Sequence, residues 1–526
     1  MSVPRHATPD QTDTHDAVEA AVPAQAPDPQ HDPTATGELS EQAIAQGAAR
    51  GFSWGLLGNV VLKFGSFAMS LVLVRILSPE DFGTYAIALA ATAFVMHIND
   101  VGLIAATVQW RGKLSEMAPT ASVLAFVFSI IIYGVFFVCA EPFARLAGNP
   151  DAAGVVRVLT FVIVLDGITA VRVGALQRRF QTDKISLANL AGFVVNFVVA
   201  VALAKSGAGA YSYAWGQVLG GVVVSVLFLY WGKLPFQLGF DRTVARRLLS
   251  FGIPVAVTLG IESIVLNADY VIVGNLLDPA MLGFYLLAFN VSSWVPGIVG
   301  TAVRYVSISG FSRLSEKDPE VLSRGVAATV PLLVTGLIPI AVVLGVLAGP
   351  IITVLYTSAW SAAAPVLSVL MILTVLRMLA SFGYDILAGA GATRAGVWVN
   401  TAWAVAVVPA LWWGTHWGGI RGAAVAQSLV ALVVAIPLTA LALHRIGVRL
   451  RPVGQGLVRP LGAGAVALAV CFLVRLALPG PWPELVVGAL ATFAVYIALA
   501  VPRDQLRTGA DAVLTRLRRR SASASA

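Results

Sequence analysis

Long apolar segments separated by short polar connections run through most of the chain. Each is about 20 residues long, enough for an α-helix to cross a hydrocarbon core of roughly 30 Å. A soluble helix keeps a polar face toward water, whereas these segments are apolar on every side. The pattern predicts fourteen transmembrane helices, at residues 53–75, 84–106, 119–140, 154–174, 186–204, 210–231, 251–274, 283–305, 327–348, 365–388, 396–414, 421–443, 458–478 and 483–501.

A repeat divides these segments into two lobes. Leu77–Tyr85 reads LSPEDFGTY and Leu277–Tyr285 reads LDPAMLGFY, an offset of 277 − 77 = 200 residues. Each copy lies between the first two apolar segments of its lobe. Because the chain direction is preserved, the lobes are parallel copies, an arrangement typical of membrane transporters. We expect an all-α polytopic membrane protein with two pseudo-symmetric six-helix lobes and two further C-terminal helices.

The later halves of the lobes match at a larger offset. Gly209 and Gln217 correspond to Gly419 and Gln427, an offset of 210 residues. The second lobe has therefore gained 210 − 200 = 10 residues, which we place in the connection 356–364.

The hydropathy pattern and the repeat divide the chain into six parts. The N-terminal part is rich in Pro, Ala, Asp, Gln and Thr and has no apolar core of a signal peptide, so we expect a disordered tail. The linker between the lobes mixes arginines with Val244 and Leu248, which predicts an amphipathic interfacial helix. The parts are an N-terminal tail (1–50), an N-lobe (51–231), a linker (232–250), a C-lobe (251–444), two extra helices (445–501) and a basic C-terminal tail (502–526).

The distribution of charged residues indicates how the chain is oriented in the membrane. The chain is 58% hydrophobic and only 12% charged, whereas soluble domains are about 25% charged. Lysines and arginines gather in alternate connections and in the C-terminal tail, and the opposite connections hold only Arg145, Lys205 and Arg421. This asymmetry places both termini and the linker in the cytoplasm, and the LSPEDFGTY-type loops outside. The net charge of +8 therefore does not indicate nucleic-acid binding.

Polar residues inside the first apolar segment form a candidate binding site. Lys63 lies with Asn59, Ser66 and Ser70 on one helical face, at spacings of 4, 3 and 4 residues. A charge within the bilayer is costly unless it meets water or a partner, so it marks a functional site by default. An ammonium suits a phosphate group, which predicts a cavity-facing contact with a diphosphate. The alternative is an intramembrane salt bridge.

Three more charged residues lie within later segments. Glu262 and Asp269 share one face of the seventh segment, and we interpret them as ion-coupling candidates. Asp269 lies nearer the outer end, where anchoring of the helix end is the alternative. Arg377 lies in the tenth segment, and its guanidinium suits bidentate binding of a phosphate. A pair between Arg377 and Asp385 on the same helix would exceed the i, i+4 reach.

These segments resemble a known transporter family. Residues 50–109, beginning RGFSWGLLGNVVLKFGSF, resemble the opening of Wzx-type polysaccharide flippases, in the multidrug/oligosaccharidyl-lipid/polysaccharide exporter superfamily. Asn267–Gly274 and Leu282–Tyr285 resemble that family's "naD-y-iiG…lG-Y" pattern. The resemblance extends to the end of the second lobe, and more weakly over the last two segments. It implies that undecaprenyl-diphosphate-linked oligosaccharide is flipped across the bacterial cytoplasmic membrane by alternating access, for an exopolysaccharide or lipopolysaccharide.

The resemblance also carries expectations about coupling and partners. Some relatives use a proton or sodium gradient, and a polysaccharide polymerase and glycosyltransferases would act beside the flippase. The first segment and its end carry only Lys63 and Arg75, which disfavours the Arg-rich peptidoglycan-precursor branch. Membrane lipid is the other expected partner.

The sequence offers no enzyme constellation. It contains no nucleotide-binding loop, no sugar-nucleotide motif and no Ser/His/Asp set outside the bilayer, so we expect no catalysis, cofactor or metal. The alternatives are a cation-coupled drug exporter of the same superfamily and a membrane polysaccharide polymerase. Lys63 and Arg377 favour an anionic substrate over a drug cation, and the short outer loops disfavour a polymerase.

Overall fold

The computed structural model describes most of the apolar part of the chain. The predicted C-terminal tail and most of the predicted N-terminal tail lie outside the described residues. The chain separates into Met1–Ala49 and Arg50–Ala526, and the contacts that define the fold lie within the second unit. The described residues are 41–99, 107, 114–179, 181–234, 239–296 and 319–501, without the side chains of 41–53, 254–266 and a few single positions.

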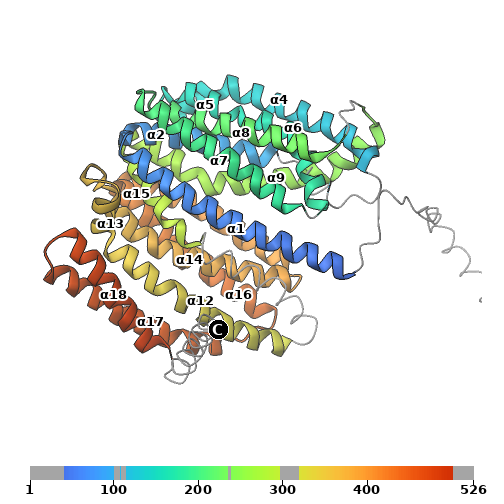
Figure 1. Ribbon diagram of the computed structural model, residues 1–526. Helices are drawn as coiled ribbons and strands as arrows, with labels where there is room; N and C mark the ends of the chain where they lie inside the picture. The colour runs from blue at the N-terminus through green and yellow to red at the C-terminus, as the bar shows by residue number, and fades with distance from the viewer. Residues whose placement is uncertain are drawn as a thin grey trace, which may run out of the picture. The chain divides into compact units, whose positions relative to one another are not determined.

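Every element in the described part of the chain is a helix (Figure 1). Within the described residues, ten helical runs are long and apolar enough to cross a membrane, which confirms the prediction of an all-helical polytopic membrane protein. The elements are α1 (Glu41–Val74), α2 (Pro79–Asn99), α4 (Leu114–Leu146), α5 (Ala152–Thr160), α6 (Val162–Arg178), α7 (Thr182–Lys205), α8 (Tyr211–Gly232), α9 (Arg242–Leu276), α10 (Pro279–Ser292), α12 (Pro319–Val346), α13 (Ala348–Leu355), a 3₁₀ turn (Ser358–Trp360), α14 (Ala363–Gly389), α15 (Thr393–Val430), a π-helical turn (Ala431–Ala435), α16 (Ile436–Arg445), α17 (Leu450–Ala477) and α18 (Pro481–Ala500).

The longest of these runs, Arg394–Arg445, is a hairpin of two arms. Its 52 residues far exceed the roughly 20 that one crossing needs. Gly418 and Gly419 leave helical geometry, and Gly419 has a positive φ of 57°, which glycine adopts without strain. The second arm then returns so close to the first that a side chain at Gly414 would press on the Gly422 carbonyl. The two spans predicted in this region correspond to the two arms.

Helices of each lobe pack mainly on one another. In the first lobe α7 pairs with α8, and α6 packs against both α4 and α8. In the second lobe α14 packs against α12, α15 and α16. The α17–α18 hairpin packs on α12, so the two extra helices are attached to the second lobe (Figure 1).

Helices α2 and α10 join the two lobes. They begin at Pro79 and Pro279, the prolines of the two repeat copies. A methyl group at Gly83 would overlap the Pro279 carbonyl, and a methyl group at Gly283 would overlap the Pro79 carbonyl. Glycine at both positions therefore permits a close backbone approach between the repeat copies.

Trp360 fills the interface beside this contact. The side chain is only 1% exposed, and its ring centre lies 4.9 Å from that of Phe82 and 5.8 Å from that of Phe284. Its indole N–H donates to the Val74 carbonyl at 3.2 Å. The end of the lobes that carries the repeat loops is thus closed by apolar packing.

The predicted amphipathic linker leads directly into a membrane helix. Helix α9 begins at Arg242 and runs without a break to Leu276. Leu248 is buried and Val244 is half-buried, and both pack in one apolar cluster with Met117 of α4. The apolar face of this segment therefore lies against the protein.

Candidate functional site

Asp269 is buried where α9, α10 and α15 meet. It is 3% exposed, and one carboxylate oxygen accepts hydrogen bonds from the Tyr285 hydroxyl at 3.0 Å and the Gln427 amide at 3.3 Å. The Gln427 amide also donates to the Tyr285 hydroxyl at 3.0 Å. The other carboxylate oxygen accepts from the Tyr270 backbone N–H at 3.0 Å. A buried polar network of this kind holds its members in one arrangement, because any loosened group loses its partners.

Arg377 lies on α14 near this network. Its guanidinium carbon is 5.8 Å from the ring centre of Phe289 and 5.9 Å from that of Trp403, so aromatic faces provide its described contacts. Among the described residues it makes no hydrogen bond or ion pair. A half-buried guanidinium whose five N–H donors bond to no described residue is suited to an anionic ligand.

The polar stripe of α1 is largely open. Lys63 is exposed and makes no hydrogen bond or ion pair within the described part of the chain. One turn further along α1, Phe67 packs on Trp294 of the second lobe with ring centres 4.2 Å apart. This side of α1 therefore lies next to the other lobe. The remaining members of the stripe are exposed at two positions and half-buried at the third: Asn59, Ser66 and Ser70.

The structure brings together only some of the residues predicted to form the site. Asp269 and Arg377 both border α10, through Tyr285 and Phe289, whose rings stack with centres 6.3 Å apart. No described hydrogen bond or ion pair connects Lys63 to them.

The other ion-coupling candidate, Glu262, lies on α9 seven residues before Asp269. Its side chain lies outside the described residues.

The network contains two residues that the sequence analysis did not assign to the site, Tyr285 and Gln427. Both are repeat positions, because Tyr285 corresponds to Tyr85 and Gln427 to Gln217. A polar residue that recurs at the same position in both lobes is the signal that could have found them.

The first lobe has the equivalent tyrosine but no carboxylate at the position equivalent to Asp269. At the 200-residue offset Asp269 corresponds to Met69, which is 5% exposed and joins the main apolar core. The counterpart of Tyr285 is Tyr85, which stacks on Tyr213 with ring centres 4.3 Å apart. The lobes therefore share a scaffold, but this buried carboxylate belongs to the second lobe alone.

Comparison with known proteins identifies the family. The family described as "Polysaccharide biosynthesis protein" matches residues 72–365, which is 365 − 72 + 1 = 294 of 526 residues. The chain belongs to this family. The match includes both repeat copies and Asp269, whereas Lys63, Arg377 and Gln427 lie outside the matched residues.

Two known proteins are similar to this chain along most of its length. The succinoglycan biosynthesis transport protein ExoT of Rhizobium meliloti (strain 1021) is 27% identical over 401 residues, covering 74% of this chain and 79% of ExoT. The lipopolysaccharide biosynthesis protein WzxC of Escherichia coli (strain K12) is 22% identical over 332 residues, covering 62% of this chain and 67% of WzxC.

Solved structures show that this chain has the fold of membrane transporters. The lipid II flippase MurJ, in an inward closed conformation, superposes with a TM-score of 0.71 at 14% identity, covering 85% of this chain and 97% of MurJ. An inward-facing multidrug resistance MATE transporter of the MOP superfamily gives a TM-score of 0.60 at 16% identity, covering 73% and 94%. The protein is thus a multi-pass membrane transporter of the flippase type in polysaccharide biosynthesis, and not an enzyme. The resemblance to Wzx-type flippases is confirmed.

Proposed function

We propose that the protein flips undecaprenyl-diphosphate-linked oligosaccharide across the bacterial cytoplasmic membrane during synthesis of a surface polysaccharide. Similarity to ExoT and WzxC supports the pathway. The observation that carries the choice of an anionic lipid substrate is Arg377, a half-buried cation without a hydrogen-bonded acid among the described residues. A polymerase and glycosyltransferases of the same pathway are the proposed protein partners.

The proposed diphosphate site uses one cation from each lobe. Arg377 of the second lobe offers a planar fork of donors that fits two phosphate oxygens at once. Lys63 of the first lobe offers a compact charge, and the other members of its stripe add polar groups: Asn59, Ser66 and Ser70. A substrate that contacts both lobes binds the two rocking states differently, which is the condition for coupling binding to movement.

The proposed orientation has fourteen spans, two six-helix lobes, two extra helices and both termini in the cytoplasm. The Lys and Arg distribution supports this orientation. The end closed by Trp360, Gly83 and Gly283 would then face outside. In this arrangement the substrate enters from the cytoplasmic side, and the α2–α10 contact separates to release it.

Ion coupling is assigned to the carboxyls of the seventh span. Asp269 and Glu262 share one face of α9, and a carboxyl whose access to water changes between two states can bind an ion in only one of them. In reconstituted vesicles an imposed proton or sodium gradient should change the flipping rate. Glu262→Gln or Asp269→Asn should remove that response; a wild-type protein indifferent to both gradients would exclude coupling.

A cation-coupled drug exporter is the second candidate. The buried Asp269 favours it, because an acidic site attracts lipophilic cations. The aromatic-framed Arg377 and the exposed Lys63 oppose it, because they would repel the same substrate. On balance we place the lipid-linked glycan first.

The proposed substrate is tested in cells that lack the native gene. Arg377→Gln should lower polysaccharide export about tenfold or more, the effect of one lost charged contact of roughly 1.5–3 kcal/mol. Lys63→Gln should lower export in the same direction. Protein abundance should stay unchanged, because neither side chain bonds to a described residue. The matched control is Arg394→Gln, an exposed arginine at the start of α15, which should export normally. Normal export by Arg377→Gln and Lys63→Gln would remove both residues from the site.

A further inference from the structure

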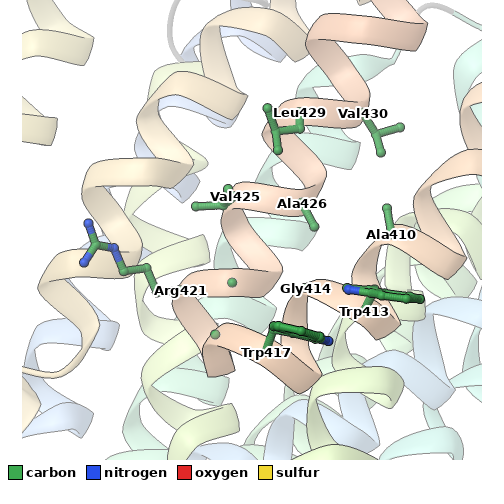
Figure 2. Close-up of a pocket in the computed structure, with 11 residues that line it drawn as sticks. Ala410, Trp413, Gly414, Trp417, Arg421, Val425, Ala426, Leu429 and Val430 are labelled. Atoms are coloured by element: carbon green, nitrogen blue, oxygen red, sulfur yellow. The ribbon is translucent and has the colours of Figure 1, made fainter.

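The α15 hairpin carries a groove that the transport site does not use. The groove has a volume of about 650 Å³ and lies between the two arms of the hairpin. Figure 2 shows two indoles on the first arm, and Arg421, Val425 and Leu429 in succession along the second arm. The residues that matter here are Trp413, Trp417, Arg421, Val425, Leu429 and Val430.

Two tryptophans form one wall of the groove. Trp413 is 61% exposed and Trp417 is 77% exposed. Their rings are nearly parallel, at 10°, with centres 6.2 Å apart. Large exposed indoles would be unfavourable in water but are typical of the membrane interface, where the ring meets both headgroups and acyl chains.

Arg421 gives the groove its charge. It is one of three basic residues in the connections predicted to lie outside, beside Arg145 and Lys205. Arg145 pairs with Glu141, whereas the exposed Arg421 makes no hydrogen bond or ion pair within the described residues. Its guanidinium therefore remains available to an external anion at the rim of an apolar groove.

The second arm of the hairpin separates the groove from the transport site. Val425 is 39% exposed and Leu429 is 54% exposed on the groove side, while Gln427 is 6% exposed on the opposite side and bonds to Asp269. Arg421, Val425 and Leu429 recur every four residues, so they form one strip about 12 Å long. A charged head and an apolar strip of this length match a membrane lipid rather than a soluble molecule.

We propose that this groove binds one anionic phospholipid. The phosphate lies at Arg421, the glycerol region lies beside Trp413 and Trp417, and one acyl chain follows Val425 and Leu429. Basic groups between membrane helices commonly hold anionic headgroups, and the indoles fix the depth of the lipid. In the orientation proposed above, this lipid belongs to the outer leaflet, but binding itself does not depend on that orientation or on the transported substrate.

The test measures lipid retention by native mass spectrometry of the full chain in detergent. The probes are phosphatidylglycerol and phosphatidylcholine of identical acyl chains. The wild-type protein should retain phosphatidylglycerol preferentially, and Arg421→Gln should lower that retention about fivefold, as expected for about 1 kcal/mol per basic residue at a membrane surface. Arg145→Gln is the matched control, because it removes an exposed arginine that already has an acid partner. An equal loss in Arg145→Gln would show only general surface charge and overturn the proposal.

A second variant tests the apolar strip without changing charge. Val425→Trp fills the groove, and it should reduce retention of both lipids while the thermal midpoint stays near that of the wild-type protein, since Val425 is partly exposed. Unchanged retention in Val425→Trp or in Arg421→Gln would contradict the assigned groove. A polyprenyl phosphate that displaces phosphatidylglycerol at equal concentration would assign the groove to the transported lipid and overturn the phospholipid.

Discussion

Gly83 and Gly283, 200 residues apart in the sequence, make reciprocal contacts across the two lobes. Each glycine lies against the carbonyl of the proline that begins the other helix, Pro279 for Gly83 and Pro79 for Gly283. A reciprocal contact of this kind places the pseudo-symmetry axis of the repeat between α2 and α10. The interface is self-complementary, so both sides are displaced together when it opens.

Adding a methyl group at this contact should open the closed end. Gly83→Ala and Gly283→Ala each force a side chain into a backbone carbonyl, and overpacking of this kind costs about 1–3 kcal/mol. We expect the added methyl group to destabilise the closed state relative to the open state, because the contact exists only when this end is closed. The measurement is labelling of a cysteine placed at the buried Tyr356, with Cys139 and Cys471 replaced by alanine. Labelling from outside should become at least about fivefold faster.

The control for this experiment is Gly336→Ala on α12. An added Cβ at Gly336 meets no atom within 4 Å, so labelling should be unchanged. If Gly83→Ala labelled no faster than Gly336→Ala, the reciprocal contact would not be part of the outer closure.

The Asp269 network should stabilise the second lobe as well as serve transport. Asp269→Leu removes the acceptor of the buried Tyr285 hydroxyl and one of the two acceptors of the Gln427 amide, and a buried donor left without an acceptor costs about 1–3 kcal/mol. Asp269→Asn keeps an acceptor oxygen and should lose less. The thermal midpoint of the purified protein should fall in the order wild type, Asp269→Asn, Asp269→Leu. At the equivalent position of the first lobe, Met69→Leu should cost less than about 1.5 kcal/mol; equal losses at both positions would contradict the network.

The helical architecture was predictable from the sequence, and the partners of Asp269 were not. Segment length and hydropathy alone indicate membrane helices, and the repeat between Leu77 and Leu277 indicates their grouping. Asp269 and Gln427 are 158 residues apart, so their contact depends on which helices meet, and hydropathy carries no information on that. Lys63 and Arg377 were found because a charge in an apolar segment is conspicuous whatever its neighbours are.

The linker shows a second limit of prediction from the sequence. Val244 and Leu248 reveal an apolar face, but the same pattern serves a membrane surface or a neighbouring helix. The structure places these residues against Met117 of α4. The sequence pattern thus indicates which face of the linker is apolar. Only the structure shows that this face packs against α4.

Reporter fusions test the proposed orientation. Fusions at Glu80 and Gly480 should score as external, because they lie in connections poor in Lys and Arg. A fusion after Arg520 should score as internal. An external signal at Arg520 would contradict an even number of spans with both termini in the cytoplasm.

Asp241, at the start of α9, makes a pH-dependent contribution to the stability of the folded state. The backbone N–H groups of Val244 and Thr243 donate to its carboxylate, and these hydrogen bonds lower its pKa below the ordinary 3.8. The folded state thus prefers the charged carboxylate, so this contribution is complete above pH 3.8 and is lost as the pH falls through the lowered value. Asp241→Asn keeps a cap that does not titrate. The difference in thermal midpoint between wild type and Asp241→Asn should shrink on acidification toward pH 3; a constant difference would contradict the assignment.

Flipping in reconstituted vesicles tests the central claim most directly. Undecaprenyl-diphosphate-linked oligosaccharide is placed in one leaflet, and the fraction that becomes accessible to a membrane-impermeant glycosidase on the other side is followed with time. The wild-type protein should expose the glycan faster than protein-free vesicles, and Arg377→Gln should return the rate toward theirs. Movement of a lipophilic drug cation with no movement of the lipid-linked glycan would contradict the account.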